Sequence, residues 1–325
     1  MLDKDLINIL KKNKKNLSKY KIICIGDIIL DHYINGKVER MSPEASIPIL
    51  KMESQQYQIG GVGNVARNIA KIGGKTSLFY LSSNDPSSVI INKMLKKEKN
   101  ISSIKIKIPN FKTPVKTRFI NKKKHMLRVD DEDNNFIIIN KYKMLIVQRL
   151  KREIKKNDLI ILSDYNKGML DEYLIKKIIN ISIRYKKLII ADPKKINLSI
   201  YSNVTLLTPN QKEVTDSAKT NFLSEKNLII FGKKLIKQYN IKNLLITRSA
   251  KGMLLINNNS IIKYKTNAKE VIDVTGAGDT VIAILSLMLS LGLSIDESIK
   301  ISNYAAGMVV GKSGTSSISY FDLIQ

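Results

Sequence analysis

The stretch LIILSDYNKGMLDEYLIKKIINISIRYKKLIIAD, residues 159–192, decides the fold class. It begins and ends with short apolar runs, 159–162 and 188–191, which are typical of strands buried on both faces. The segment between them, 171–185, has the length and the apolar spacing of an amphipathic helix. A strand, a helix and a second strand in this order indicate a parallel sheet that is covered by helices.

The same alternation continues in both directions along the chain. Further strands are predicted at residues 21–25, 76–81, 205–207 and 244–247, and further helices at 62–72, 87–97, 141–155, 211–218 and 228–239. We therefore predict an α/β fold with a mostly parallel central sheet between helices. Such sheets bind their ligands at the carboxyl ends of the strands.

Two segments break this alternation. Residues 47–59 and 112–129 alternate apolar and polar side chains, as half-exposed strands do, and neither is expected to lead directly into a helix. They predict a small β lid that projects from the main body. Residues 1–20 are predicted to form a helical extension, and residues 21–325 a single domain that includes the lid strands.

The composition narrows the class of protein. The chain has 325 residues, a formal net charge of +27 and one cysteine, so it forms no disulfide within the chain, and a reducing cytoplasm is expected. No secretory signal is recognised, and the longest apolar run, 281–289, is shorter than the ~20 residues that span a bilayer. Because the lysines are spread over the whole length, we expect phosphorylated metabolites rather than nucleic acid as partners, and no membrane association.

The stretch DVTGAGDTVIAILSLMLSLG, residues 273–292, places one carboxylate at the start of an apolar helix. Gly276 and Gly278 allow another molecule to approach the unpaired N–H groups of the first turn, where the helix dipole favours an anion. Asp279 can therefore be a side chain that satisfies its own helix terminus, or a base beside an anion site. This stretch alone leaves both interpretations open.

Two other stretches carry polar groups that suit a sugar. In GDIILDHY, residues 26–33, Asp27 and Asp31 follow the first predicted strand and either accept hydrogen bonds from hydroxyl groups or serve as turn and surface residues. In GGVGNVARNIAKIGG, residues 60–74, the glycine-rich helix start with Asn64 suits a polyol. The same glycines match the fingerprint G-x-G-x-x-A, but the preceding ESQQYQI is too polar for the buried strand that a dinucleotide fold requires.

The stretch LLTPNQKEVTDS, residues 206–217, has Asn210 and Glu213 three positions apart at a predicted helix start. This spacing is that of a capping box, and it also suits a carboxylate that holds Mg²⁺ against nucleotide phosphates. The sequence contains no Walker motif, and neither His32 nor His125 has the context of a Ser–His–Asp hydrolase.

Taken together, GGVGNVARNIAKIGG, TPNQKE and DVTGAGDT resemble the signatures of the ribokinase-like (PfkB) carbohydrate kinases, from about residue 21 to the end. Within this family, GDIILDHYINGKVERMSPEASIPILK, LSDYNKGML, ADPKK, LLTPNQKE, LLITRSAKGM and VVGKSGTSSIS are similar, in the same order, to the heptose 7-phosphate kinases. The resemblance implies a ribokinase-like three-layer sandwich. It also implies transfer of the ATP γ-phosphate to the anomeric (C1) hydroxyl of D-glycero-D-manno-heptose 7-phosphate. This reaction belongs to ADP-heptose and lipopolysaccharide core synthesis. The resemblance further implies ATP and Mg²⁺ as cofactors, a monovalent cation as a further candidate, and a homodimer formed through the lid.

The resemblance also implies roles for individual residues. Asp279 would be the general base, and Gly276, Ala277 and Gly278 would form the anion hole for the transferring phosphoryl group. The nucleotide would be held by Asn210, Gln211, Lys212, Glu213, Arg248, Ser249 and Gly252, with Glu213 also serving the metal. The sugar would be held by Asp27, Asp31, Gly60, Gly61 and Asn64, and candidate cations for its phosphate are Arg118, Arg128, Lys167 and Lys194. Each of these four cations could equally be a solvated surface charge.

Some features depart from the family pattern. Val62 and Gly63 stand where two small residues are common, and Ala250 and Lys251 replace a more polar pair, which puts ligand affinity in doubt. Two alternatives stay open: another sugar or sugar-phosphate kinase of the family, and a non-catalytic sugar- or nucleotide-binding regulator. In many bacteria such kinases are fused to an adenylyltransferase, whose H-x-G-H motif is not found here, so a free-standing kinase or a kinase half is expected.

Overall fold

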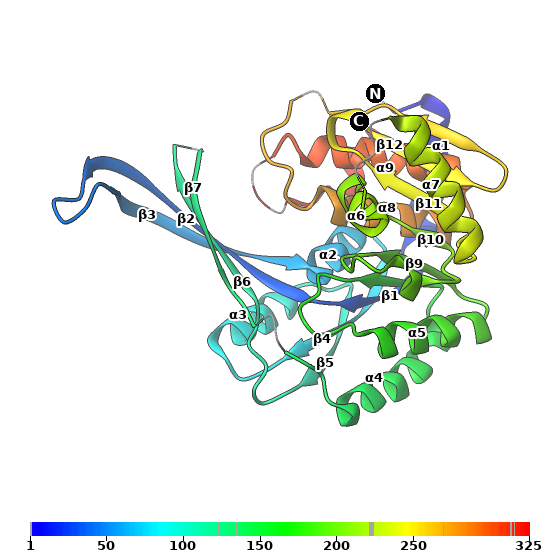
Figure 1. The fold of residues 1–325 in the computed structure, drawn as a ribbon, viewed down its shortest axis with the longest axis horizontal. Helices are drawn as coiled ribbons and strands as arrows, with labels where there is room; N and C mark the ends of the chain where they lie inside the picture. The colour runs from blue at the N-terminus through cyan, green and yellow to red at the C-terminus, as the bar shows by residue number, and fades with distance from the viewer. Residues whose placement is uncertain are drawn as a thin grey trace.

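The computed structural model describes residues 2–122, 124–133, 136–220, 224–268, 270–312, 314 and 316–325. Within them, a nine-stranded sheet with the order β13-β12-β11-β10-β9-β8-β1-β4-β5 forms the centre of the larger body (Figure 1). Its strands are β1 (Lys21–Gly26), β4 (Lys75–Ser82), β5 (Ile101–Lys107), β8 (Leu159–Ser163), β9 (Leu188–Asp192), β10 (Leu206–Leu207), β11 (Asn243–Thr247), β12 (Met253–Asn257) and β13 (Ile261–Tyr264). Neighbours from β11 to β5 are parallel, and β12 and β13 extend the edge in antiparallel fashion, which confirms the mostly parallel central sheet.

The central strands read as continuous apolar runs because their side chains alternate between two cores. In β1, Ile22 and Cys24 belong to one hydrophobic cluster, whereas Ile23 and Ile25 belong to the other. All four are fully buried, and each large apolar side chain buried in this way contributes ~1.5–3 kcal/mol. Both faces of the sheet therefore need a layer of helices.

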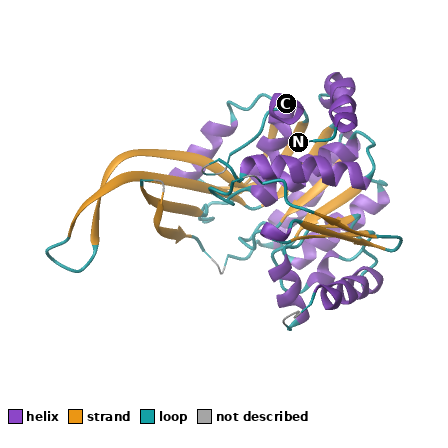
Figure 2. Cartoon of the chain, turned by 90° about the horizontal axis from the view of Figure 1, so that it is seen from above, coloured by secondary structure: helices purple, strands orange, loops and turns teal. Residues whose placement is uncertain are grey.

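Helices cover both faces of the sheet (Figure 2). The core on one face includes residues of α1 (Lys4–Leu17), α2 (Val62–Ile72), α3 (Pro86–Leu95), α8 (Ala277–Ser290), α9 (Ile295–Val309) and α10 (Tyr320–Ile324). The core on the other face includes residues of α4 (Asn140–Glu153), α5 (Glu172–Arg184), α6 (Gln211–Ala218) and α7 (Glu225–Gln238). Three short 3₁₀ helices, η1 (Ile154–Lys156), η2 (Leu198–Tyr201) and η3 (Ser249–Lys251), complete the elements of the described residues.

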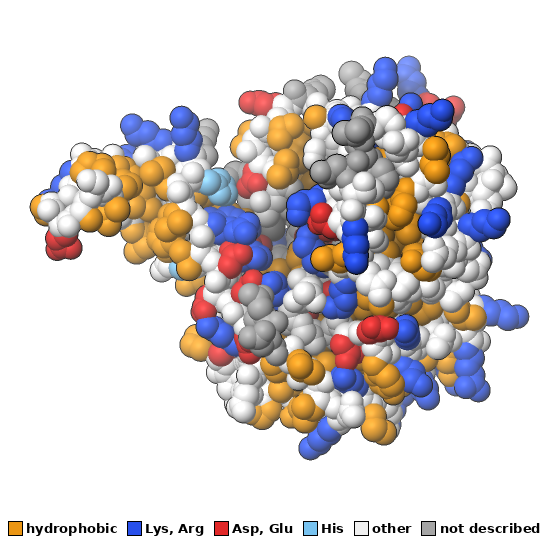
Figure 3. Space-filling model, viewed as in Figure 1, with side chains coloured by type: hydrophobic (Ala, Val, Ile, Leu, Met, Phe, Trp, Pro, Cys, Tyr) orange, Lys and Arg blue, Asp and Glu red, His pale blue; other side chains and the backbone are white. Residues whose placement is uncertain are grey.

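A separate four-stranded sheet, called the lid sheet below, projects from this body (Figures 1 and 2). Its order is β3-β2-β6-β7, with β2 (Ile28–Met41), β3 (Pro48–Gly61), β6 (Val115–Asn121) and β7 (Lys124–Asp131). Apolar side chains lie exposed along it (Figure 3), among them Met41, Ile47, Met52, Met126, Leu127 and Val129. The small β lid that the alternating segments predict is confirmed.

Several details of the sequence prediction were wrong. The long strand β2 was not predicted, and Asp31 lies inside it, buried rather than a solvated surface charge. Segment β3 runs directly into α2, contrary to expectation, because Gly61 adopts a positive φ of 58° that turns the chain between them. The strands β5, β12 and β13 were also missed.

The N-terminal helix α1 lies within the predicted extension, while the division at residue 20 stays a prediction. Met1 of that extension, Lys123 of the second predicted lid segment, and Ser313 and Thr315 of the stretch VVGKSGTSSIS lie outside the described residues. Among the helices of the described residues, none combines the length and the apolar character needed to cross a membrane.

Candidate active site

Asp279 lies in the first turn of α8, a helix whose residues are buried from Asp279 to Met288. The helix begins at Gly276, which adopts the left-handed conformation with φ 80° and ψ 1°. A side chain added to Gly278 would meet no atom within 4 Å, so there is open space in front of the first turn. The first-turn N–H groups have no carbonyl partner within the helix, and they favour an anion in that space.

Two neutral side chains hold the carboxylate of Asp279, which is only 3% exposed. Asn64 Nδ2, at the start of α2, donates to Oδ2 at 2.8 Å, and the Tyr165 hydroxyl, after β8, donates to Oδ1 at 2.7 Å. Burial raises the pKa of Asp279 to about 6, and these two hydrogen bonds act in the opposite direction. A carboxylate with this pKa is ionised at neutral pH and can accept a proton, as a general base must.

The loop that carries Tyr165 is fixed by Asp27, at the end of β1. The Asp27 carboxylate accepts hydrogen bonds from three backbone N–H groups of this loop, those of Tyr165 at 2.9 Å, Lys167 at 3.0 Å and Met169 at 2.8 Å. Burial and then the charge of Asp164 raise the pKa of Asp27 to about 6, against the three amide bonds. The main contacts of Asp27 are therefore within the protein.

The predicted sugar residues Gly60 and Gly61 lie against the two aspartates. A Cβ at Gly60 would come within 2.3 Å of the Asp31 carboxylate, and one at Gly61 within 2.3 Å of the Asp27 carbonyl oxygen. Asp31 is 3% exposed and forms an ion pair with Arg118 of β6, with Nη1 and Oδ1 2.6 Å apart. Only glycine fits at these two positions, because the Asp31 carboxylate and the Asp27 backbone lie directly against them.

The other candidate cations have acidic partners in the structure. Lys167 lies 2.6 Å from Glu132, and Arg128, more than half exposed, lies 2.9 Å from Asp130. Figure 3 shows blue and red side chains close together where the lid sheet meets the larger body. Lys194 lies apart from these residues and forms an ion pair with Glu213 at 3.0 Å.

Apart from Glu213, the residues predicted to hold the nucleotide border two adjoining hollows. An apolar cavity of about 640 Å³ is lined by residues from η3, α8 and α9, including Arg248, Ser249, Gly252, Ala277 and Gly278. A second hollow, with Asn210, Gln211 and Lys212 on its wall, shares the segment from Thr247 to Ala250 with the first. The apolar wall suits a nucleobase, and the first turn of α8 brings unpaired N–H groups to the same space.

Glu213 and Asn210 form the capping box of α6 that their spacing predicts. Asn210 Oδ1 accepts from Glu213 N, and Glu213 Oε2 accepts from Asn210 N, each at 2.9 Å. Partial burial, followed by the charges of Glu213 and Asp279, raises the pKa of Asp192, at the end of β9, well above its usual value. No group of three potential metal ligands occurs in the described part of the chain, so a cation here would depend on ligand phosphates and water.

Three site residues were missed by sequence reasoning. Asp164 and Tyr165 directly follow β8, and Asp192 is the last residue of β9. Both strands were predicted, so the rule that parallel sheets bind ligands at the carboxyl ends of their strands could have found these side chains.

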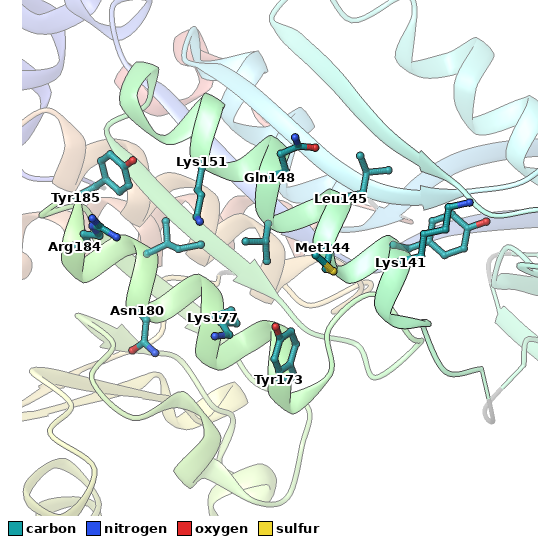
Figure 4. Close-up of a pocket in the computed structure, with 13 residues that line it drawn as sticks. Lys141, Met144, Leu145, Gln148, Lys151, Tyr173, Lys177, Asn180, Arg184 and Tyr185 are labelled. Atoms are coloured by element: carbon teal, nitrogen blue, oxygen red, sulfur yellow. The ribbon is translucent and has the colours of Figure 1, made fainter.

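A larger hollow of about 1200 Å³ lies elsewhere, between α4 and α5 (Figure 4). Its wall includes Met144, Tyr173, Lys177 and Arg184, and no residue of the site described above.

A family model, the pfkB family carbohydrate kinase, matches residues 19–320, nearly the whole chain. The chain therefore belongs to the pfkB carbohydrate kinase family and is an ATP-dependent sugar kinase. Kinases of this family use ATP together with a divalent cation.

Relatives of known name cover the same region. The chain is 36% identical over 315 residues to the "Bifunctional protein HldE" of Granulibacter bethesdensis, covering 95% of this chain and 65% of that protein. It is 37% identical over 304 residues to the protein of the same name from Sulfurimonas denitrificans, covering 93% of this chain and 63% of the relative. The chain thus spans less than two thirds of these relatives.

Solved structures agree on the fold. The phosphofructokinase-2 of Escherichia coli in complex with potassium superimposes with a TM-score of 0.78 at 16% identity, over 94% of this chain and 96% of that one. A ribokinase of Arabidopsis thaliana in complex with ribose and ATP gives a TM-score of 0.72 at 15% identity, over 95% and 99% of the two chains. These similarities confirm the ribokinase-like fold.

Proposed function

We propose that this pfkB-family kinase phosphorylates the anomeric C1 hydroxyl of D-glycero-D-manno-heptose 7-phosphate, with ATP as the donor, to give the 1,7-bisphosphate. The observation that carries the proposal is the buried Asp279 carboxylate in the first turn of α8, held by Asn64 and Tyr165, with Gly278 of the same turn facing open space. The choice of heptose rests on the sequence stretches similar to heptose 7-phosphate kinases and on relatives that are 36–37% identical.

In the proposed reaction, Asp279 accepts the proton of the C1 hydroxyl group. The hydroxyl oxygen forms a bond to the γ-phosphorus atom of ATP, while the bond from that phosphorus to the bridging oxygen of ADP breaks. Of the anion hole predicted at Gly276, Ala277 and Gly278, the Ala277 N–H group already donates to the Val274 carbonyl oxygen at 3.2 Å. We therefore propose that the N–H groups of Gly278 and Asp279 stabilise the negative charge on the transferring group. General-base assistance of this kind contributes ~10²–10⁴-fold in rate.

We propose Glu213 and Asp192 as the carboxylates that hold Mg²⁺, directly or through water. Their crowding raises the pKa of Asp192, and hard carboxylate oxygens suit this ion. When bound, Mg²⁺ neutralises phosphate charge. Because Lys194 pairs with Glu213, we assign it to the nucleotide phosphates rather than to the sugar.

For the acceptor phosphate we propose the cations of the lid sheet and the loop after β8. Arg118, Arg128 and Lys167 are paired with carboxylates, and a phosphate group could replace these partners. The hydroxyl groups of the sugar would meet Asp31, the backbone of Gly60 and Gly61, and Asn64, with Asp27 holding the loop beneath.

Three further features belong to this proposal. We propose a homodimer formed through the lid sheet, because apolar side chains such as Met52 and Leu127 are more than half exposed there. We also propose activation by a monovalent cation and a cytoplasmic location. Sedimentation equilibrium tests the first, and exchange of potassium for choline in the assay tests the second.

The decisive experiment measures ATP consumption with Mg²⁺ and a panel of acceptors: heptose 7-phosphate, heptose without the phosphate, fructose 6-phosphate and ribose. We expect turnover with heptose 7-phosphate and a product that carries phosphate on C1, identified by ³¹P NMR. Preference for another acceptor would replace the heptose assignment with a different sugar kinase. If no sugar is phosphorylated although ATP binds, a non-catalytic regulator becomes the better interpretation.

A further inference from the structure

Tyr165 is the one side chain of the loop after β8 that reaches the proposed base. Its hydroxyl donates to Asp279 Oδ1 at 2.7 Å, although 114 positions separate the two residues. Burial and then the charges of Asp279 and Asp192 hold the pKa of Tyr165 well above its usual value. The hydroxyl therefore keeps its proton and remains a donor throughout the pH range in which a carboxylate titrates.

The loop gives Tyr165 little freedom. Its own backbone N–H and those of Lys167 and Met169 all donate to the carboxylate of Asp27. At the adjacent Asp164, the backbone N–H of Asn166 donates to Oδ1 at 2.8 Å. Four of the five residues from Tyr165 to Met169 thus donate their backbone N–H groups to two aspartates at the ends of neighbouring strands, β1 and β8.

We propose that Tyr165 is a positioning residue: its hydroxyl fixes the carboxylate of Asp279 in the orientation that receives the proton of the acceptor hydroxyl. This inference rests on the proposed role of Asp279 as the base. With Oδ1 held by Tyr165 and Oδ2 held by Asn64, the carboxyl group cannot rotate about its χ2 bond without breaking both hydrogen bonds. The remaining lone pairs then point in fixed directions, and a near-attack geometry depends on such fixation.

Tyr165 also favours the ionised form of Asp279, because a hydrogen bond donated to a carboxylate stabilises its charge. The other groups that act on Asp279 are Asn64 on α2, Asp31 on β2, which is paired with Arg118, and Asp192 at the end of β9. On α9, the acidic residues Asp296 and Glu297 are in the first turn, which follows the last turn of α8 and so lies far from Asp279. Tyr165 is thus one of two neutral donors among mostly acidic neighbours.

The chain contains a matched control. The Tyr201 hydroxyl donates to Asp164 Oδ2 at 2.6 Å, so it is a second hydrogen bond from a tyrosine to a buried aspartate, but it does not touch Asp279. Replacing either tyrosine with phenylalanine removes one hydroxyl group from one carboxylate. A general loss of stability would appear in both variants, whereas an effect on Asp279 is expected only in Tyr165→Phe.

The primary experiment titrates the ¹³C carboxyl resonance of Asp279 in protein labelled at aspartate Cγ, assigned by its absence from Asp279→Asn. We expect a midpoint near 6 in the wild type, an upward shift of about one pH unit or more in Tyr165→Phe, and no shift in Tyr201→Phe. This readout needs no substrate, so it stands even if the acceptor proves not to be heptose 7-phosphate. It also avoids confusion with a phosphate group of the acceptor, which titrates in the same range.

Kinetics provide the second readout. In Tyr165→Phe, we expect kcat to fall, the KM for ATP to stay unchanged, and the acid limb of the rate profile to move upward with the NMR midpoint. A second variant carries 3-fluorotyrosine at position 165, whose hydroxyl is a stronger hydrogen-bond donor. We expect it to lower the titration midpoint of Asp279, and it provides a test if Tyr165→Phe does not fold. An Asp279 midpoint that is the same in all variants overturns the inference, as does an unchanged kcat in Tyr165→Phe.

Discussion

The carboxyl end of β1 and the N-terminus of α8 each present a buried aspartate, and the two differ in what holds them. Asp27 and Asp279 are both 3% exposed, and burial raises the pKa of each to about 6. The donors to Asp27 are three backbone N–H groups of one loop, whereas the donors to Asp279 are the side chains of Asn64 and Tyr165. Burial and pKa alone therefore do not distinguish an anchor from a base.

The distinction lies in the donors and in the surrounding space. Backbone amides cannot turn away from Asp27 without moving the loop, so its role is to hold the chain. Side-chain donors can rotate away from Asp279, and its neighbours Ala277 and Gly278 in the first turn of α8 line the apolar cavity of about 640 Å³. We therefore expect the same amino acid, with the same burial, to fix a loop at position 27 and to serve as the proposed base at position 279.

The largest expected effect is the loss of activity in Asp279→Asn. The amide cannot accept the proton of the hydroxyl group, and loss of a general base costs ~10²–10⁴-fold in rate. We expect kcat to fall by this factor while ATP binding, measured by calorimetry, is retained. If kcat fell less in Asp279→Asn than in Asp27→Asn, Asp27 rather than Asp279 would be the better candidate for the base.

The next effect is a gain in stability in the same variant. A rise in the pKa of Asp279 from 3.8 to about 6 means that the folded chain binds more protons than the unfolded chain between these values. The contribution of this carboxyl group to stability is thus fully present below about pH 4 and is lost as the pH rises through about 6. Asp279→Asn should therefore be more stable than the wild type by up to about 3 kcal/mol above pH 7, with no difference near pH 4.

Chemical denaturation of both proteins at several pH values measures this difference. The Tyr165 hydroxyl can accept a hydrogen bond from the new amide group while Asn64 Nδ2 still donates to the amide oxygen, so both contacts are kept. A difference that does not depend on pH contradicts the raised pKa of Asp279.

The smallest expected effect is the difference in the free energy of unfolding between Asp27→Asn and Asp279→Asn at the same pH. Both variants lose a buried charge with a similar pKa, so that contribution cancels between them. In Asp27→Asn, however, the new NH₂ group faces a backbone N–H group that cannot rotate, and one hydrogen bond is lost. We expect Asp27→Asn to be less stable than Asp279→Asn by about 1–3 kcal/mol in the free energy of unfolding, measured with urea. Equal stabilities of the two variants would contradict the proposed distinction between side-chain donors and backbone donors.

Much of the larger body follows from local pattern. Segments such as 62–72 and 211–218 were predicted with the bounds that α2 and α6 have, because their apolar spacing and end signals agree. The strands β12 and β13 at one end of the sheet were missed, since short antiparallel strands carry no helix between them. The strand β2 was missed because its second half is exposed and polar, so its length depends on pairing with β3.

The site was predictable in its parts but not in its connections. Asp279, Asn64 and Asp27 were all identified, yet nothing local indicates that Asn64 and Asp279, 215 positions apart, form a hydrogen bond. The role of Tyr165 depends on a loop that Asp27 fixes from another strand, and such tertiary contacts leave no periodic signal.

The direct passage from β3 into α2 has a mechanical consequence. The lid sheet and the helix that carries Asn64 are consecutive pieces of one chain, joined only by Gly60 and Gly61. Any change in the tilt of the lid must either be absorbed by the dihedral angles of these two glycines or be transmitted to Asn64, and through it to Asp279. In the proposed mechanism, movement of the lid and alignment of the base are thereby linked through two glycines at the end of β3.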